Sequence, residues 1–406
     1  MKIMFVTIEG FDTPNSNNHL THRLIKDLLS KGHKVYLVES NRNGELKDIP
    51  DDLTNNDGFE YDAIHRKVVN KTNFIARYLE GIDFFCRAQK VWKNKIENVE
   101  VCIVQSTPTA YYAIKNLSKK HRKKVIYSIY DVFPDGIFEI NAMKKGILFK
   151  VLSYLQYKAY GLCKKIVVLS NDMKQKLISN GVESEKIEVV VSWYDETVIH
   201  EVETNNNEFI KKYNIDCSKK YVQYAGNFGY TFDWKMVLEI AKLLKTRDDI
   251  IFHMIGSGTF EKKFKEEVKR NSLKNVIFFP WQPLDIIMDV YSAATIALIP
   301  LSKHVLGNSH PSKASLLMAC GRTFVCTGRK DSDLINTYNL LKVSIGVADD
   351  DPRSAADAVV ELIDNLSLRR AYECAAKKHA NVELSGTRNT ERFLKAIQAV
   401  SDGDCI

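Results

Sequence analysis

Short apolar runs and longer amphipathic segments alternate along the first half of the chain. The runs have the length of buried strands and are bounded by polar turn residues. Residues 18–30 follow the first run and repeat apolar positions at helical spacing, so they predict a helix. Strands that alternate with helices predict a parallel sheet. The expected strands of this half are residues 2–7, 34–39, 101–105, 125–129 and 166–169.

The same alternation resumes after a polar stretch at residues 195–217, which we interpret as the region that links two domains. The sequence therefore predicts an α/β protein with two doubly wound, Rossmann-like domains, residues 1–195 and 196–384, facing a central cleft. A C-terminal helix within residues 385–406 is expected to pack back on the first domain. The expected strands are 221–225, 250–255, 276–279, 295–300, 323–326 and 343–347, and the expected helices are 233–244, 314–319, 352–365, 368–380 and 387–400.

Composition indicates a globular enzyme. The chain has 406 residues, of which 45% are hydrophobic and 27% charged, and no apolar run reaches the roughly 20 residues that span a bilayer. Residues 1–7 enter a strand pattern without the features of an export signal, so we expect a cytoplasmic protein. The eight cysteines form no CxxC pair, and the net charge of +8 favours anionic partners without choosing among them.

Two segments combine an expected strand with a tight turn or a helix start. One is the glycine turn, residues 226–229, which lies between a strand and a helix and consists of Gly226, Asn227, Phe228 and Gly229. The other precedes the helix 314–319 and consists of Asn308, Ser309, His310, Pro311, Ser312 and Lys313. In this second segment a serine at 309 or 312 can cap the helix, and the proline suits the first turn.

The second segment also carries a positive charge at a helix start. Unpaired backbone amides at such a start bind anions, and Lys313 would add its ammonium to them. The helix dipole opposes a lysine in the first turn, so this lysine favours a ligand role over a solvated surface position. Together the two segments predict a ligand that bears a diphosphate.

The loop after the first strand supports a minor alternative, a dehydrogenase. Its one glycine, Gly10, does not complete a GxGxxG pattern, which argues against a nicotinamide cofactor. Glu39 ends the second strand, where an acid can hold a ribose or can simply be exposed to solvent. Gly10 better suits a flexible loop at the cleft that lets an acceptor or a donor phosphate approach closely.

Five short motifs occur in order along the chain. They are Asp131-Val132-Phe133-Pro134-Asp135; Ser192-Trp193-Tyr194-Asp195; Tyr224-Ala225-Gly226-Asn227-Phe228-Gly229; Gly256-Ser257-Gly258; and Pro311-Ser312-Lys313 followed by Met318-Ala319-Cys320-Gly321-Arg322. Through them the chain resembles, over nearly its full length, the retaining glycosyltransferases of family four, which have the two-domain GT-B fold; the first motif is similar to their DxWP and the second to their NWxD. Within that family it is most similar to bacterial O-antigen and capsule enzymes of the N-acetylfucosaminyltransferase type.

The resemblance implies transfer of a sugar from a nucleotide diphosphate to an acceptor hydroxyl, with retention at the anomeric carbon. Negative charge develops on the leaving diphosphate, so the site needs preorganised donors and cations. Lys313 fits this catalytic role, as do the amides of Ser312, Lys313, Phe228 and Gly229. Asp131 is the second catalytic candidate, where its carboxylate would bind the attacking hydroxyl or stabilise an oxocarbenium-like state; turn chemistry before Pro134 explains it equally well.

Other candidates follow from the same resemblance. Asp135 is a further acceptor-side candidate, with Glu139 beside it in the sequence. Gly256 and Gly258 follow a strand and allow the backbone to approach a base or ribose, or form a plain turn. Trp281 lies in the segment 279–282, which resembles the family segment whose main chain contacts the base.

The chain also departs from the family pattern. Many members carry two glutamates eight positions apart, where this chain has Asn308 and Leu316. Asn308 can still donate a hydrogen bond to a sugar hydroxyl, whereas leucine cannot hold a ribose. The basic pair that many relatives place after the glycine turn is replaced by Tyr230 and Phe232, and Lys235 is better explained as a helix-surface lysine.

No metal or other cofactor is expected, because the family fold works without a divalent ion. The acidic run 349–351 precedes a proline and a helical stretch, so it is interpreted as helix capping.

Residues 143–158 interleave lysines with apolar side chains, which is typical of a helix on an anionic membrane surface or of a core-packed helix with a solvated face. Nucleic acid is not an expected partner.

These observations favour a retaining glycosyltransferase that uses a UDP-linked N-acetylated or deoxy sugar. The resemblance implies a polyprenyl-diphosphate-linked saccharide as acceptor, in surface polysaccharide synthesis at the inner face of the plasma membrane. Two alternatives stay open. A GT-B nucleotide-sugar epimerase would release an altered free sugar without an acceptor. A non-catalytic assembly subunit would bind nucleotide weakly or not at all.

Overall fold

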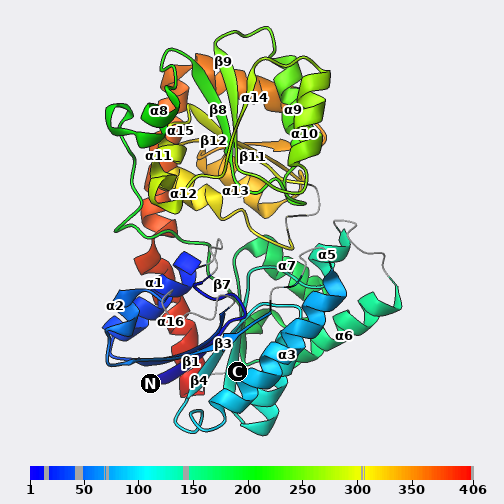
Figure 1. The fold of residues 1–406 in the computed structure, drawn as a ribbon, viewed down its shortest axis with the longest axis vertical. Coiled ribbons are helices and arrows are strands. Elements are labelled where there is room, and N and C mark those ends of the chain that lie inside the picture. The colour runs from blue at the N-terminus through cyan, green and yellow to red at the C-terminus, as the bar shows by residue number, and fades with distance from the viewer. Residues whose placement is uncertain are drawn as a thin grey trace. The chain divides into compact units, whose positions relative to one another are not determined.

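The chain forms two compact units, each built from segments that are distant in the sequence (Figure 1). The computed structural model describes residues 1–12, 18–41, 49–67, 69, 73–139, 146–302, 305 and 307–403, with the backbone alone described at 137 and 139. Unit 1 comprises Met1–Ser192, Gly307–His310 and Gly386–Ile406. Unit 2 comprises Trp193–Leu306 and Pro311–Ser385.

A seven-stranded parallel sheet forms the centre of unit 1, with strand order β3-β2-β1-β4-β5-β6-β7. The apolar runs of the sequence supply its inner strands, which are almost wholly buried. Burial on both faces explains why these strands are continuously apolar. The strands are β1 (Lys2–Val6), β2 (Lys34–Asn41), β3 (Phe59–His65), β4 (Val101–Gln105), β5 (Lys124–Ile129), β6 (Lys165–Val168) and β7 (Ile187–Val189).

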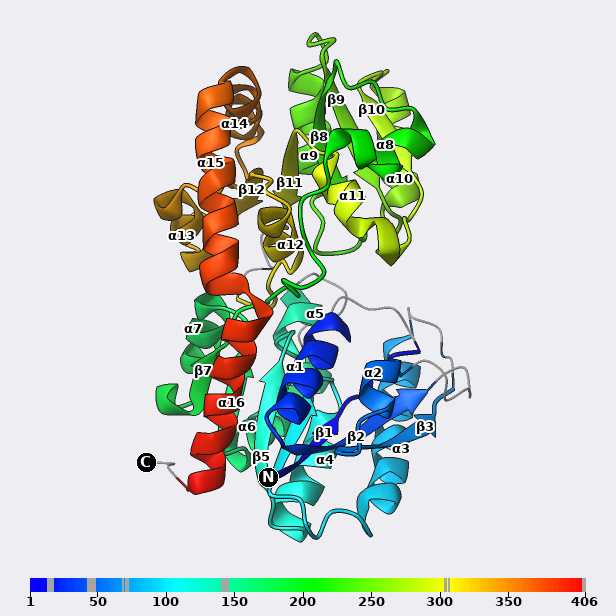
Figure 2. The same ribbon diagram turned by 90° about the vertical axis from the view of Figure 1, so that its left-hand side faces the viewer.

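Helices pack against both faces of this sheet. On one face α1 contacts α16, which also contacts β4, β5 and β6; Figure 2 shows the two helices side by side. A second group is formed by α3, α4 and α6, which contact one another in that order. The helices of unit 1 are α1 (Asn18–Ser30), α2 (Asp51–Thr54), α3 (Phe74–Trp92), α4 (Ala110–Lys115), α5 (Asp135–Glu139), α6 (Ile147–Leu162), α7 (Asn171–Ser179) and α16 (Gly386–Asp402).

Polar contacts fix α16 within unit 1. The guanidinium of Arg23 on α1 donates to the hydroxyl of Thr387 at 2.9 Å. At the other end of α16, the ammonium of Lys124 at the start of β5 donates to the carbonyl of Ser401. The side chain of Phe393 is buried on the face between these contacts. The last helix of the chain is therefore part of the core of unit 1.

Unit 2 has a six-stranded parallel sheet, with strand order β10-β9-β8-β11-β12-β13. The two sheets confirm the expected α/β architecture. The strands are β8 (Lys220–Ala225), β9 (Ile250–Ile255), β10 (Val276–Phe279), β11 (Ile296–Pro300), β12 (Phe324–Gly328) and β13 (Ile345–Ala348). The helices are α8 (Glu208–Tyr213), α9 (Trp234–Leu243), α10 (Glu261–Arg270), α11 (Ile287–Ser292), α12 (Lys313–Ala319), α13 (Asp333–Leu341), α14 (Pro352–Asp364) and α15 (Leu366–His379).

Helix starts in unit 2 follow from their capping residues. Asp351 accepts a hydrogen bond from the amide of Ser354, and Pro352 occupies the first turn of α14. This confirms capping as the explanation of the acidic run. Asp233 accepts from the amides at the start of α9 in the same way. That cap fixes where α9 begins after the glycine turn.

A buried histidine makes the stability of unit 2 sensitive to pH. His253 on β9 is 1% exposed, stacks on Tyr221 with ring centroids 4.1 Å apart, and has no hydrogen bond from either ring nitrogen among the described residues. Desolvation lowers the pKa of its imidazole to about 4. Protonation must therefore oppose folding, because the unfolded chain takes up the proton at a pKa of about 6.5.

The free energy of unfolding should have its full value well above pH 6.5 and should decrease as the pH drops toward 4. We expect the His253→Phe variant to remove about 2 kcal/mol of the stability loss between pH 7 and pH 5. Urea unfolding at the two pH values measures this difference. The exposed His200 provides the control, since His200→Phe also replaces one histidine by phenylalanine. An equal pH dependence of wild type and His253→Phe would contradict the prediction.

Candidate functional site

The strand order of unit 2 reverses between β8 and β11, which lie side by side at the centre of its sheet. Ligands of open α/β sheets bind at such a switch point, beyond the carboxyl ends of the strands. The glycine turn, residues 226–229, begins where β8 ends. An antiparallel bridge between Phe232 and Leu301 ties the segment after this turn to the end of β11. The fold therefore places the glycine turn where a ligand is expected.

Lys313 brings a positive charge to the same place. The ammonium nitrogen lies 3.8 Å from the centroid of the Tyr224 ring, on the strand that leads into the turn. A Cβ atom at Gly226 would lie 2.7 Å from this nitrogen, so a side chain there would displace the lysine. Desolvation lowers the pKa of the half-buried Lys313 to about 7. A phosphate bound here would stabilise the ammonium form.

The glycines of unit 2 allow neighbouring loops to pack tightly. A Cβ at Gly256 would lie 2.1 Å from the carbonyl oxygen of Gly226, and one at Gly258 would lie 2.4 Å from Oδ1 of Asn227. The amide of Phe228 donates to the carbonyl of Ser257 at 2.8 Å. The expectation that this amide binds a phosphate is therefore wrong, because a neighbouring loop already uses it. Close approach of the chain to itself accounts for both glycines of the Gly256–Gly258 loop.

The start of α12 differs from the sequence prediction. The helix begins at Lys313 with Ser312 at the N-cap position, and this serine makes no capping hydrogen bond through its side chain. Pro311 lies before the cap rather than in the first turn, and Ser309 is further away still. Among the described residues, the amides of Ser312 and Lys313 take part in no hydrogen bond. With seven residues α12 is short, so the case for an anion depends on the lysine and on the glycine turn.

Aromatic side chains border the glycine turn. Trp281, just beyond β10, is 56% exposed, and its Cε3 atom would lie 3.3 Å from a Cβ at Gly256. This tryptophan could stack on a base from the position that the sequence predicted. Phe232 occupies one place of the basic pair of relatives and is buried, with its ring stacked on Tyr224 at 4.3 Å. Lys235 is exposed, with its ammonium 6.0 Å from the ring centroid of Trp234.

In unit 1, Asp131 follows β5 and pairs with Ser309 in an antiparallel bridge. The carbonyl of Asn308 accepts from the amide of Val132 at 2.7 Å. Residues Gly307–His310 thus group with unit 1, whereas the predicted domain boundaries assign Asn308, Ser309 and His310 to the second domain. The long-range pairing with Asp131 explains this correction. Buried Asn308 stands at the first glutamate position of many relatives.

The carboxyl of Asp131 is subject to two opposing effects. Desolvation by the surrounding protein raises its pKa, and a hydrogen bond with Ser309 lowers it. The net effect raises the pKa, and solvent reduces the desolvation because the side chain is exposed. His310 follows in the same segment. Desolvation lowers the pKa of its imidazole to about 4, although the charge of Asp172 raises that pKa to a smaller extent.

Two other acceptor-side candidates have structural partners in unit 1. Asp135 begins α5, and its carboxylate lies 3.5 Å from the ammonium of Lys176. A Cβ at Gly10 would lie 1.9 Å from the carbonyl oxygen of Ser40, so this glycine permits close packing of the loop after β1. Glu39 is 1% exposed and accepts from the amide of Phe11. Its interpretation as an exposed strand-end residue is wrong, and its carboxylate holds the same loop.

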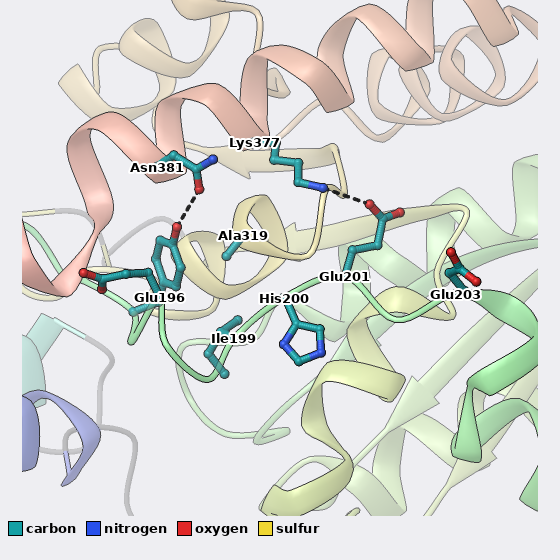
Figure 3. A pocket seen from close by; sticks show the side chains of 9 residues that line it. Glu196, Ile199, His200, Glu201, Glu203, Ala319, Lys377 and Asn381 are labelled. Atoms are coloured by element: carbon teal, nitrogen blue, oxygen red, sulfur yellow. Dashed lines mark hydrogen bonds and ion pairs between the residues drawn. The ribbon is translucent and has the colours of Figure 1, made fainter.

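A pocket of about 450 Å³ lies elsewhere in unit 2, along the chain that follows Trp193 (Figure 3). The ammonium of Lys377 lies 3.3 Å from a carboxylate oxygen of Glu201, and the hydroxyl of Tyr194 donates to Asn381 at 2.8 Å. None of the predicted site residues lines this pocket. Its lining residues are Tyr194, Glu196, Ile199, His200, Glu201, Glu203, Ala319, Lys377 and Asn381.

The described part of the chain holds neither a candidate metal cluster nor a candidate membrane span. There, no group of three or more histidine, cysteine, aspartate and glutamate side chains is placed to hold a metal ion. None of the helices within the described ranges is long and apolar enough to cross a membrane.

Known structures share this architecture over the whole chain. Sucrose-phosphate synthase from Thermosynechococcus elongatus superposes with a TM-score of 0.76 at 11% identity, covering 99% of both chains. HepE of Anabaena in complex with UDP gives 0.74 at 11% identity, covering 98% of this chain and all of the other. WaaG, a glycosyltransferase involved in lipopolysaccharide biosynthesis, gives 0.65 at 14% identity, covering 96% and 98%. The fold is that of the GT-B glycosyltransferases.

Sequence comparison assigns the family. The model for Glycosyltransferase Family 4 matches residues 18–197, and the model for Glycosyl transferases group 1 matches residues 219–365. A relative from Escherichia coli (strain K12), named "Putative colanic acid biosynthesis glycosyl transferase WcaI", is 22% identical over 317 residues, or 77% of this chain and 75% of that protein. The chain belongs to the family-four glycosyltransferases.

Proposed function

We propose that the protein transfers a sugar, with retention of anomeric configuration, from a UDP-linked donor to a lipid-linked saccharide acceptor in surface polysaccharide synthesis. The observation that carries the donor site is the position of Lys313 against Tyr224 and Gly226, at the switch point of unit 2. A cation at this position can stabilise the charge that develops on a leaving diphosphate. Unit 1 would supply Asp131 on the acceptor side.

Similar proteins support the finer parts of the proposal. HepE was crystallised with UDP, which favours a uridine nucleotide, and exposed Trp281 offers a surface for the base. WcaI is named for colanic acid biosynthesis, and WaaG is involved in lipopolysaccharide biosynthesis. Both concern bacterial surface polysaccharides, so we infer an acceptor of that class. An N-acetylated or deoxy sugar and independence from metal remain parts of the proposal.

Calorimetric titration with UDP, GDP and NAD at matched concentrations tests the donor site. We expect UDP to bind, with GDP weaker and NAD without heat. Preference for NAD would overturn the proposal. If none of the three nucleotides gives binding heat, a non-catalytic assembly subunit is favoured instead. Asn308 and Leu316, at the two glutamate positions of many relatives, motivate that alternative.

Product analysis tests the reaction itself. Incubation with a UDP-sugar and a lipid-diphosphate-linked saccharide should give a new glycosidic bond, and NMR of the early product should show the anomeric configuration of the donor. Adding EDTA should leave the rate unchanged if the reaction needs no metal ion. Release of an altered free sugar without acceptor would identify an epimerase, and an inverted product would overturn retention.

We also propose peripheral attachment of unit 1 to an anionic membrane surface. α6 exposes apolar side chains beside Lys150 and Lys158, and the neighbouring start of α3 also exposes apolar side chains. Phe74 of α3 and Phe149 of α6 pack on one aromatic cluster with Phe133, so the two helix starts lie together. The exposed apolar residues are Ile75, Leu79, Ile147, Leu148, Val151, Tyr154 and Tyr157. The lysines of the predicted segment before residue 146 lie outside the described residues.

Vesicle sedimentation tests this attachment. Ile147 on α6 is 84% exposed, and Ile147→Glu should reduce binding to vesicles of phosphatidylglycerol roughly tenfold, because burying a carboxylate in the interface is unfavourable and the lipid is anionic. Leu340 on α13 of unit 2 is 83% exposed, so Leu340→Glu is a matched control that should bind like wild type. Failure of the wild type to sediment with these vesicles at low salt would refute the proposal.

A further inference from the structure

One aromatic side chain contacts both parts of the candidate donor site in unit 2. Tyr224 is the fifth residue of β8 and is 3% exposed. The face of its ring lies under the ammonium of Lys313, 3.8 Å from the centroid. At the far edge of the same ring, the hydroxyl donates to the carbonyl of Asn227 at 2.8 Å. The lysine belongs to α12 and the carbonyl to the glycine turn.

Each contact has a direct physical effect. An aromatic face attracts an ammonium group, and the attraction is stronger where water is excluded. A hydrogen bond to the carbonyl of Asn227 limits rotation of the peptide that joins Asn227 to Phe228, inside the glycine turn. The ring itself cannot move freely, because it stacks on Phe232 with centroids 4.3 Å apart and lies 5.8 Å from the ring of Phe228.

We propose that Tyr224 is a positioning residue of the donor site, which holds the Lys313 ammonium with its ring and the glycine turn with its hydroxyl. This inference depends on the proposed function, since it concerns the diphosphate that the ammonium would meet. It goes beyond that function by naming what fixes the ammonium in the absence of a basic pair after the glycine turn. Tyr230 and Phe232 stand at those two positions, so the contribution of the Lys313 ammonium depends on its accurate placement.

The electrostatics of the lysine support a role for the ring. Desolvation is the sole cause that lowers the pKa of Lys313, so no charged group of the described residues contributes to the shift. The titratable side chain that the described structure places against the ammonium is Tyr224, whose own pKa is raised by desolvation and, to a smaller extent, by Tyr291. The phenol is therefore neutral over the working pH range. Its ring face can attract the ammonium through a cation–π contact.

The two contacts can be separated by substitution. Tyr224→Phe keeps the ring face and removes the hydroxyl, whereas Tyr224→Leu removes both. Phe232→Leu is a matched control, because it truncates a buried ring of the same aromatic cluster and contacts Tyr224. Thermal unfolding of all three variants shows whether the fold is kept, and UDP affinity is then measured from pH 6 to pH 9.

For the wild type, UDP affinity should decrease above about pH 7, where the lysine loses its proton. Tyr224→Leu should bind UDP roughly tenfold more weakly, and its affinity should begin to fall about one pH unit lower, because the ammonium form has lost the ring. Tyr224→Phe should lose affinity about threefold with no change in the pH at which binding declines. In Phe232→Leu that pH should also be unchanged.

The outcomes separate this inference from the proposed function. If wild type binds UDP and the pH dependence of Tyr224→Leu equals that of Phe232→Leu, the positioning role is refuted and the donor site stands. If wild type itself does not bind UDP, the proposed function has failed. If Tyr224→Leu does not fold, the UDP affinity of Tyr224→Phe becomes the test. An unchanged UDP affinity of Tyr224→Phe would refute the role of the hydroxyl contact.

Discussion

The Lys313→Ala variant should lose transfer activity by about 100-fold or more in kcat/KM, as expected when a preorganised donor to a developing anion is removed. The ammonium is packed against Tyr224 and Gly226, and no other lysine of the described residues lies over that ring. Alanine also removes the charge that a bound diphosphate would meet. Initial rates with a UDP-sugar and a lipid-linked acceptor, measured as a function of donor concentration, give this ratio.

Lys235→Ala controls for loss of one positive charge near the glycine turn. Lys235 is exposed on α9, so its substitution should change kcat/KM less than about twofold. Comparable losses in the two variants would show that overall charge, rather than the position of one ammonium, governs the rate. Full activity of Lys313→Ala would remove this lysine from the catalytic site.

Breaking the buried ion pair of unit 1 should have the largest effect on stability. Arg66 follows β3 and Glu80 lies on α3, and the two side chains are each 7% exposed and joined by a hydrogen bond from Nε to Oε2. Arg66 also donates to the carbonyl of Ile8 at 2.9 Å. Arg66→Met would leave a buried carboxylate without its partner, which typically costs about 3–5 kcal/mol.

A double-mutant cycle tests this explanation. Arg66→Met with Glu80→Leu replaces both charges by apolar side chains and leaves no unpaired carboxylate, so it should be less destabilised than Arg66→Met alone by about 3–5 kcal/mol. Urea unfolding of wild type, both single variants and the double variant gives the coupling energy. A double variant whose loss equals the sum of the single losses would show that the pair is not coupled.

The inner strands could be predicted because they are apolar on both faces. β9, for example, has the bounds that the apolar run indicated. β3 was missed because it alternates polar and apolar residues at an edge of the sheet, as in Phe59–His65, and β7 because it has three residues. Short or half-polar strands depend on their neighbours for hydrogen bonds and packing, and one sequence does not display those neighbours.

The parts of the candidate site differ in the same way. Lys313 was found from its place before a helix, because charge at a helix start has a local signature. The hydrogen bond from the Phe228 amide to Ser257 could not be predicted from the sequence, because the two residues meet only when β8 and β9 align. The pairing of Asp131 with Ser309 joins residues far apart in sequence. Tyr224 belongs to one of the family motifs, but its contact with Lys313 forms only in the folded protein.

The discontinuous make-up of unit 1 has a consequence for synthesis of the chain. Its sheet is complete by β7, yet α16, which contacts α1 and three of its strands, is made only after unit 2. On the ribosome the apolar side chains on the face of the sheet that α16 covers therefore stay uncovered until unit 2 has been synthesised. Nascent unit 1 is therefore an expected client of chaperones, and a stop codon before residue 386 should leave it aggregation-prone.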